Sequence, residues 1–388
     1  MRRFLVIIGL QAYAVLLALY QGLGSVQTDE AKYLLNIPYP HPPLGRSILN
    51  WLEFVPHQEL VWRIVFATLL VQSVWLIASM ARKFTPEDKL TLCGLWMFAA
   101  SVLFQSGTVM MAVLTALQGM VFVWLLLSDE DRYPGWIALL WLASLFTAYQ
   151  AVLYLPIVIA IFIRMRIHTY LKIFAVGVPM LLMALYIVTN PLAAASFINA
   201  GGQNLQEPIS ELLKVTLTSW LWAGSAILSV CGLIGILRGK QWALLLSFLL
   251  VAVFHMTSFR QYYPVFFLPI LVGGVIAYPQ VLKKSATLLA LQIIMATYIF
   301  AHADLSFAES SARTVMREVN QLPQEGAVLI AGSFGHQWQY ESRSPVLKYR
   351  PSLLSKAKVV VCLEECSGVS DYEFYQITNI PQEVWVRK

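Results

Sequence analysis

Long apolar segments joined by short polar connections fill the first three quarters of the chain. About 20 helical residues cover the roughly 30 Å hydrocarbon core of a bilayer, and shorter spans are tolerated. The division of two of these segments near Thr147 has the least support in the pattern. The sequence predicts about eleven membrane-spanning helices, near residues 4–23, 59–80, 90–106, 109–127, 136–147, 150–164, 173–189, 217–237, 242–257, 264–280 and 286–303.

The pattern changes after residue 303, where apolar runs become short and alternate with polar stretches. Strands that alternate with a helical pattern are typical of a small α/β domain. We therefore predict a membrane domain over 1–303, with outer loops near 24–58 and 190–216, and a second domain over 304–388. The elements expected in the second domain are a helix from Phe307 to Leu322, a loop at 332–336, and strands from Ala327 to Ala331, Lys358 to Leu363 and Glu383 to Arg387.

Composition and charge agree with an α-helical polytopic membrane protein. Hydrophobic residues make up 58% of the 388 residues and charged residues 12%, whereas soluble domains carry about 25% charge. Lysine and arginine gather on alternate connections, for example Arg82 and Lys83 after the second span. The positive-inside rule therefore predicts a cytoplasmic N-terminus and an outer 24–58 loop. An odd number of spans also makes the C-terminal domain extracytoplasmic. The net charge of +6 then reflects topology, and nucleic acid is not an expected partner.

Two features leave alternatives open. Arg2 and Arg3 ahead of the first apolar run resemble the start of a cleaved signal peptide, although the run is long for one. Cys362 and Cys366 lie close together in the tail, where an oxidising compartment permits a disulfide. Both the bridged and the reduced state remain open at this point. A metal site is not expected there, because the usual second pair of ligands is missing.

The polar island after the first span carries the most chemistry. It begins with Asp29 and Glu30 and ends with the run from His41 to Arg46. Two adjacent carboxylates gain nothing in a lipid-facing core, because their desolvation is costly without a partner or water. A site that accepts a proton from a hydroxyl at the membrane surface does need a carboxylate. Asp29 and Glu30 are therefore the candidate catalytic residues.

One reaction that uses such a carboxylate is the transfer of a sugar from a lipid phosphate to a hydroxyl. This reaction also needs groups that hold the phosphate as it leaves, and a groove for the lipid tail. Candidates for these groups lie on the same predicted side of the membrane. Side-chain cations can do the charge work, so no cofactor is required, and a divalent metal is possible but not indicated. The candidate phosphate holders are Arg46, Arg63 and Arg260 with Tyr262 and Tyr263, and Lys32 as a weaker one.

The first outer loop resembles that of protein O-mannosyltransferases and bacterial aminoarabinose transferases, which belong to the GT-C class of lipid-linked glycosyltransferases. The resemblance rests on the Asp29-Glu30 pair, on Tyr33 at an aromatic position, and on His41-Pro42-Pro43-Leu44-Gly45-Arg46, where Arg46 stands in place of the common lysine. Arg63 and the run Arg260-Gln261-Tyr262-Tyr263 resemble the class more weakly. Tyr33 and His41 thereby join the candidate substrate-binding residues.

The resemblance implies a GT-C-like helical fold, a polyprenyl-phosphate sugar donor, inversion at the anomeric carbon, and catalysis by the aspartate of the pair, here Asp29. One departure stands out. Many members of the class have a further acidic residue in the outer turn between the third and fourth spans, whereas residues 105–111 of this chain contain no carboxylate. Either another group, such as Glu207 or Glu211, fills that role, or the site is altered. The chain is also short for the class, which favours a prokaryotic member in an inner or plasma membrane.

The candidate residues also have structural interpretations. Asp29 could cap a helix that runs to Leu35, and Glu30 could be a first-turn carboxylate favoured by the helix dipole. His41 could be a turn residue. Arg63 could reach the outer interface without touching substrate.

The same holds for the residues near position 260 and for the tail. Arg260 could anchor the outer interface, with Tyr262 and Tyr263 in an aromatic belt. The run from Phe334 to Trp338 offers aromatic rings that stack on a sugar, but Trp338 could equally lie in the core.

The sequence therefore predicts an integral-membrane glycosyltransferase that moves a monosaccharide from a polyprenyl phosphate to a protein, lipid or glycan acceptor on the outer face. A lipid-linked sugar transporter or flippase is an alternative, although few charges lie in mid-span and no matching halves are visible. A degenerate relative that binds the lipid-linked sugar without turnover is another alternative. No motif specifies the sugar or the acceptor.

Overall fold

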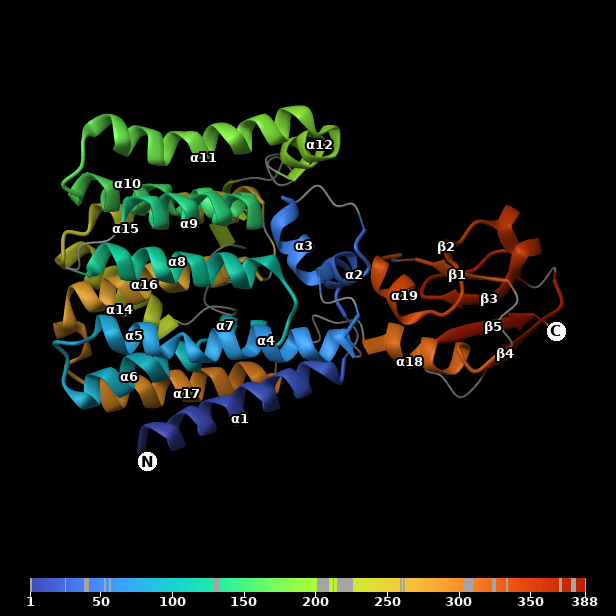
Figure 1. Cartoon of the computed structure of the whole chain (residues 1–388). Coiled ribbons are helices and arrows are strands. Elements are labelled where there is room, and N and C mark those ends of the chain that lie inside the picture. The colour runs from blue at the N-terminus through green and yellow to red at the C-terminus, as the bar shows by residue number, and fades with distance from the viewer. Residues whose placement is uncertain are drawn as a thin grey trace. The chain divides into compact units, whose positions relative to one another are not determined.

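The computed structural model describes residues 2–24, 26–37, 42–51, 54–55, 57–128, 133–200, 209–211, 213–214, 226–258, 260, 262–302, 310–322, 326–332, 334–369, 372–377 and 382–387 (Figure 1). The chain divides into two compact units. The helical unit comprises Met1–Leu19 and Pro38–Ala303, and the sheet unit comprises Tyr20–Ile37 and Asp304–Lys388. A boundary near residue 303 was expected, but the segment Tyr20–Ile37 groups with the sheet unit rather than with the membrane helices.

The described part of each predicted span is mostly helical. Short 3-10 helices at Tyr149–Tyr154, Tyr263–Phe266 and Pro279–Leu282 extend some of the α-helices. The α-helices are α1 (Arg2–Gly22), α3 (Pro43–Trp51), α4 (Gln58–Gln72), α5 (Val74–Met80), α6 (Pro86–Met97), α7 (Ala100–Gln105), α8 (Met111–Leu127), α9 (Pro134–Thr147), α10 (Leu155–Arg164), α11 (Thr169–Thr189), α12 (Pro191–Ala200), α14 (Ala226–Arg238), α15 (Trp242–Thr257), α16 (Phe267–Ala277) and α17 (Ser285–His302).

Three stretches of helix among the described residues are long and apolar enough to cross a membrane: Phe4–Gly22, Gln58–Met80 and Thr169–Thr189. Most of the other predicted spans contain a shorter apolar stretch of helix, of 10–17 residues. The first and third of the long stretches are only 11% buried, as expected for helices whose apolar side chains face lipid. The chain is therefore a multi-pass integral membrane protein, and the number of about eleven spans stays a prediction.

One predicted span is interrupted and one predicted division is present. The 90–106 segment forms α6 and α7, separated at Ala99, whose backbone is extended (φ −65°, ψ 128°). No proline or glycine marks this break, so the apolar pattern concealed it. The division near Thr147 is confirmed, because α9 ends there, Ala148 is extended, and the next helical segment begins at Tyr149.

Two central helices, α8 and α16, carry long runs of buried residues, and α14 packs against α16 (Figure 1). The backbones of α14 and α16 touch through glycines. A Cβ added at Gly235 would meet the carbonyl oxygen of Gly274, and one added at Gly274 would meet that of Gly232. Small residues at such crossings allow close van der Waals contact, which matters because lipid provides no hydrophobic drive between helices.

The sheet unit holds a five-stranded sheet with the order β2-β1-β3-β5-β4. The first three strands in this order are parallel, and β5 pairs antiparallel with β3 and β4. Besides α2 (Thr28–Leu34), the elements of this unit are α18 (Ser310–Val319), β1 (Ala327–Ala331), α19 (His336–Glu341), β2 (Val346–Lys348), a 3-10 helix at Pro351–Lys356, β3 (Ala357–Cys362), β4 (Phe374–Ile377) and β5 (Glu383–Arg387). The sequence predicted β1, β3 and β5 within one residue, and missed β2, β4 and α19.

Alternate side chains of the strands build two cores, as the two-residue period of a strand requires. Val328 and Ile330 of β1 pack with α18 residues and with Trp338, whereas Leu329 packs with Phe374 and Leu354. Trp338 is fully buried, so the suggestion that it stacks on a sugar is wrong. The described part of the predicted tail helix begins at Ser310, and its start at Phe307 lies outside the described residues.

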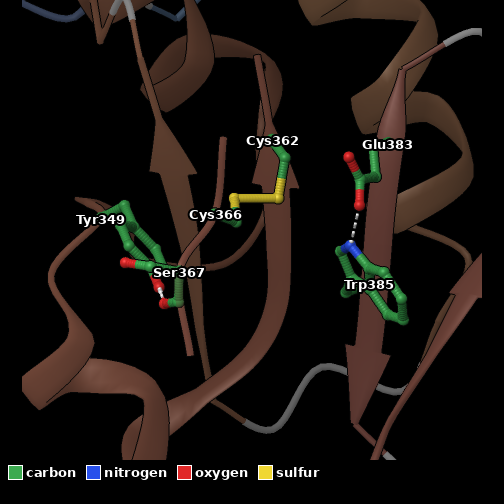
Figure 2. Close-up of a disulfide and its surroundings, with 6 residues drawn as sticks. All are labelled: Tyr349, Cys362, Cys366, Ser367, Glu383 and Trp385. Carbon is green, nitrogen blue, oxygen red and sulfur yellow. Dashed lines mark hydrogen bonds between the residues drawn. A yellow bond between two sulfur atoms is a disulfide. The ribbon is translucent and has the colours of Figure 1, made fainter. Parts of the chain in front are cut away.

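Figure 2 shows that Cys362, the last residue of β3, is bonded to Cys366 in a disulfide. The Tyr349 hydroxyl donates to the carbonyl of Ser367, so both sides of this short loop are tied to the sheet unit. The sequence left the bridge open, and the structure forms it. Disulfides of this kind persist in oxidising compartments.

We predict that Gly274→Leu destabilises the helical unit. A side chain there has no room beside α14, and overpacking of this kind costs about 1–3 kcal/mol or more. The midpoint of thermal unfolding in detergent should fall. Gly177→Leu on α11 is the matched control, because nothing lies within 4 Å of a Cβ at that position. Equal effects of the two substitutions would contradict the proposed close crossing.

Candidate active site

The acidic pair lies in α2, a short helix of the sheet unit. Its first turn contains both Asp29 and Glu30. The Glu30 carboxylate accepts a hydrogen bond from the backbone N–H of Gln27 at 2.8 Å, and only 1% of Glu30 is exposed. This is the capping arrangement in which an acid three residues into a helix satisfies a donor at its start. Glu30 is thus a first-turn carboxylate with a structural contact, as its alternative interpretation stated.

Asp29 has a different environment from its neighbour. It is the second residue of α2 rather than the cap, which is Gln27, and the helix ends at Leu34, so the capping interpretation of Asp29 is wrong. Its carboxylate accepts a hydrogen bond from the Lys32 ammonium at 3.0 Å, and its side chain is 23% exposed. Lys32 therefore orients the carboxylate, while solvent still reaches it. Tyr33, on the same short helix, is buried.

A contact with the C-terminal part of the chain fixes the start of α2. The Thr28 hydroxyl donates to the side-chain carbonyl of Gln337, which lies in α19 and is 4% exposed. Gly335, just before α19, permits this approach, because a Cβ there would meet both Thr28 Oγ1 and Gln337 Oε1. Asp29 follows Thr28 directly, so its place within the sheet unit depends on α19. Sequence reasoning missed Thr28 and Gln337, since 309 positions separate them.

The end of α1 is held in the same unit. Arg313 of α18 donates to the carbonyl of Gly22 at 2.6 Å and pairs with Glu341 of α19 at 2.8 Å. Gly22 is the last residue of α1 and Thr28 the first of α2, so the connection that leads to Asp29 is held at both ends within the sheet unit. This explains why Tyr20–Ile37 groups with the C-terminal elements.

Apart from Lys32, the described candidate phosphate holders belong to the helical unit, where one turn, residues 105–111, joins α7 to α8. The Arg63 Nη1 donates to the carbonyl of Gly107 at 2.8 Å. Gly45, next to Arg46 in α3, lies against the Met111 side chain. The 3-10 helix Tyr263–Phe266 packs on both α7 and α8. Arg63 therefore contacts the turn that lacks the acid found in many relatives, and segments next to Arg46 and Arg260 pack near it.

Arg63 is the most constrained of these residues. Its Nε lies 2.8 Å from Glu59 Oε1, and only 1% of the Arg63 side chain is exposed, against 17% for Glu59. Arg63 does not reach out to the interface, so the snorkelling interpretation is wrong. Sequence reasoning missed Glu59, although its four-residue spacing from Arg63 is the one that favours ion pairs on a helix. Glu59 brings a carboxylate to an arginine that contacts the 105–111 turn.

The remaining candidates are less informative. Arg260 is exposed, and Tyr263 packs with Tyr262, Phe254 and Phe266, which fits the aromatic-belt interpretation. Glu211 lies on an exposed helical turn beside Lys214. His41 and Glu207 lie outside the described residues.

The fold, with apolar helices around two central ones and a small α/β unit, is similar to that of solved structures. ArnT from Cupriavidus metallidurans in the apo state has a TM-score of 0.65 at 11% identity, covering 99% of this chain and 98% of that one. The same protein bound to undecaprenyl phosphate gives 0.63 at 11% identity, covering 98% and 97%.

A second solved protein shares part of its fold with this chain. The arabinofuranosyltransferase AftD from Mycobacteria, as an R1389S mutant, has a TM-score of 0.50 at 13% identity and matches all of this chain with 41% of its own. No family model and no curated protein matches the sequence. At these identities the likeness is one of fold.

We predict that Arg63→Met strongly destabilises the protein. It would leave the Glu59 carboxylate without its arginine and the Gly107 carbonyl without its donor, and removing one partner of a buried pair costs about 3–5 kcal/mol. Thermal unfolding in detergent measures the loss, and the double variant with Glu59→Leu should recover part of it. Arg238→Met, at the exposed end of α14, is the control. A midpoint no lower than that of the control would show that the pair does not stabilise the fold.

Proposed function

We propose that the chain is an integral-membrane glycosyltransferase that takes a monosaccharide from a polyprenyl phosphate. The observation that carries the proposal is the likeness of fold, over nearly the whole of both chains, to ArnT in complex with undecaprenyl phosphate. The first-loop resemblance points to the same class from the sequence alone. A donor of this kind has its phosphate at the membrane surface and its lipid tail among the helices. The candidate residues lie near the predicted outer ends of the spans, and the spans are apolar.

In the proposed reaction an acceptor hydroxyl oxygen attacks the anomeric carbon from the side opposite the phosphate. The bond from that carbon to the phosphate oxygen breaks, the polyprenyl phosphate departs with the electron pair, and the configuration inverts. Asp29 accepts the hydroxyl proton, which is work for a carboxylate that is oriented and partly exposed. Lys32 orients the Asp29 carboxylate, and because its ammonium is engaged there, it is a weaker candidate to hold the phosphate. Neither a metal nor a cofactor is required.

Cationic residues would stabilise the phosphate as its charge grows. Arg46, Arg63 and Arg260 are the proposed holders, with Tyr33, His41, Tyr262 and Tyr263 as further substrate-binding residues. Glu59 is a better proposal than Glu207 or Glu211 for the missing acid, because Arg63 links it to the turn where relatives carry theirs.

The proposed topology places the reaction on the extracytoplasmic face, with the N-terminus in the cytoplasm. The lysine and arginine distribution supports it. The Cys362–Cys366 disulfide supports the same side for the sheet unit, since such bonds persist in oxidising compartments. A protein, lipid or glycan acceptor would meet the sheet unit there.

We expect Asp29→Asn to abolish transfer while donor binding is retained. Loss of a general base lowers a rate by about 10²–10⁴-fold. The assay is transfer from a panel of radiolabelled polyprenyl-phosphate sugars by the purified protein, with membrane extract as acceptor. Asp88→Asn, in the first turn of α6, removes a comparable carboxylate elsewhere and should leave the rate within twofold of wild type.

The outcomes separate the candidate functions. Label that moves into a protein or lipid fraction with the wild type, but not with Asp29→Asn, supports a transferase and narrows both sugar and acceptor. Unchanged transfer by Asp29→Asn would remove Asp29 from the mechanism. Donor binding without transfer from any sugar would instead favour a lipid-linked sugar binder or transporter.

Gln337 tests whether α19 positions Asp29. Gln337→Leu removes the acceptor of the Thr28 hydroxyl, so we expect a lower kcat with little change in the donor KM, whereas Gln337→Glu keeps an acceptor oxygen and should restore kcat. Gln339→Leu, on the exposed side of the same helix, is the control. Equal loss in the Leu and Glu variants would contradict a positioning role.

A further inference from the structure

A cavity of about 440 Å³ lies in the helical unit at the end of α8 that is remote from the 105–111 turn. The ends of α5, α8 and α16 and the turn after α5 form its walls. Its volume is within the range of small-molecule sites, which is about 300–1,000 Å³. Because α8 has 17 residues, the cavity is about 25 Å from the turn that Arg63 contacts. It is therefore separate from the proposed donor site.

The chemistry of the wall is that of an anion site with an apolar floor. Among the described residues that line the cavity, the charged ones are Arg82 and Lys83, and none is a carboxylate. Ser79 and Ser128 supply hydroxyl groups, and Trp124 with Phe84 supplies aromatic surface. The two cations are exposed, and Phe84 is 8% exposed, so charge lies at the mouth and apolar surface behind it.

We infer that this cavity binds the headgroup of an anionic phospholipid of the phosphatidylglycerol class. The cations pair with the phosphate, and the serines are within the same wall to bind a glycerol hydroxyl. A lipid fits better than free phosphate, because Met80, Leu127 and Ile276 in the wall would cover the glycerol backbone and first acyl carbons. The cavity opens where apolar helices end, at the predicted cytoplasmic surface, and basic pockets between membrane helices on that side bind anionic headgroups.

The test measures binding of two lipids to the full-length protein in detergent by native mass spectrometry. Wild type should bind phosphatidylglycerol about 10–30-fold more tightly than phosphatidylcholine, as two basic residues near the headgroup predict. The double variant Arg82→Gln/Lys83→Gln should lose that preference. Arg238→Gln/Lys240→Gln removes the same charge from the next basic connection outside the cavity and should keep the preference within twofold.

A second variant protects the test against misfolding. Ser128→Trp fills the cavity without changing its charge and should also abolish the preference. Equal preference in wild type and both cavity variants would overturn the inference. Equal binding of the two lipids by wild type would also overturn it.

A final arm separates lipid from free phosphate. Inorganic phosphate, compared with sodium chloride at equal ionic strength, should leave phosphatidylglycerol bound. Displacement by phosphate alone would show that the site takes the free ion, which contradicts the lipid assignment. None of these readouts uses sugar transfer, so the inference stands or falls independently of the proposed function.

Discussion

The hydrocarbon core of the membrane is the constraint on which this structure depends. In lipid, every backbone N–H and carbonyl must find a partner within the protein, so the spanning segments are helices. Lipid also removes the hydrophobic drive between helices, so close contact has to hold them together. The glycine crossing of α14 and α16 meets this need, and chemistry that requires charge is confined to the helix ends.

Arg63 shows how strictly that confinement operates. It is almost fully buried, yet its Nε donates to Glu59 and its Nη1 to the Gly107 carbonyl. A buried charge is tolerated when it is paired and hydrogen-bonded. The contact with the Gly107 carbonyl also holds the turn from α7 to α8. Arg63, one of the residues proposed to hold phosphate, thus connects Glu59 of α4 to the turn between α7 and α8.

The second organising feature is that α2 is part of the sheet unit. Gln337 and Arg313 hold the segment between Gly22 and Asp29, so elements more than 280 residues apart in the sequence shape one helix. If Asp29 is the catalytic carboxylate, the part of the chain that would meet an acceptor also sets the position of the proton acceptor. A change in the sheet unit could then reach the chemistry without touching the membrane helices.

The sequence by itself determined the parts that depend on local pattern. Apolar periodicity and composition specify the spans, the α/β character of the tail and strands such as β1 and β3, because a run of apolar residues must be buried in lipid or in a core. The first-loop motif pointed to the GT-C class, and the fold is similar to that of ArnT. What only the tertiary structure decided is which distant side chains meet. Trp338 in the core, Gln337 beside Thr28 and the Gly107 carbonyl at Arg63 all depend on contacts between segments far apart in the sequence. Hydrogen bonds and ion pairs need partners in three dimensions, and a one-dimensional pattern does not record them.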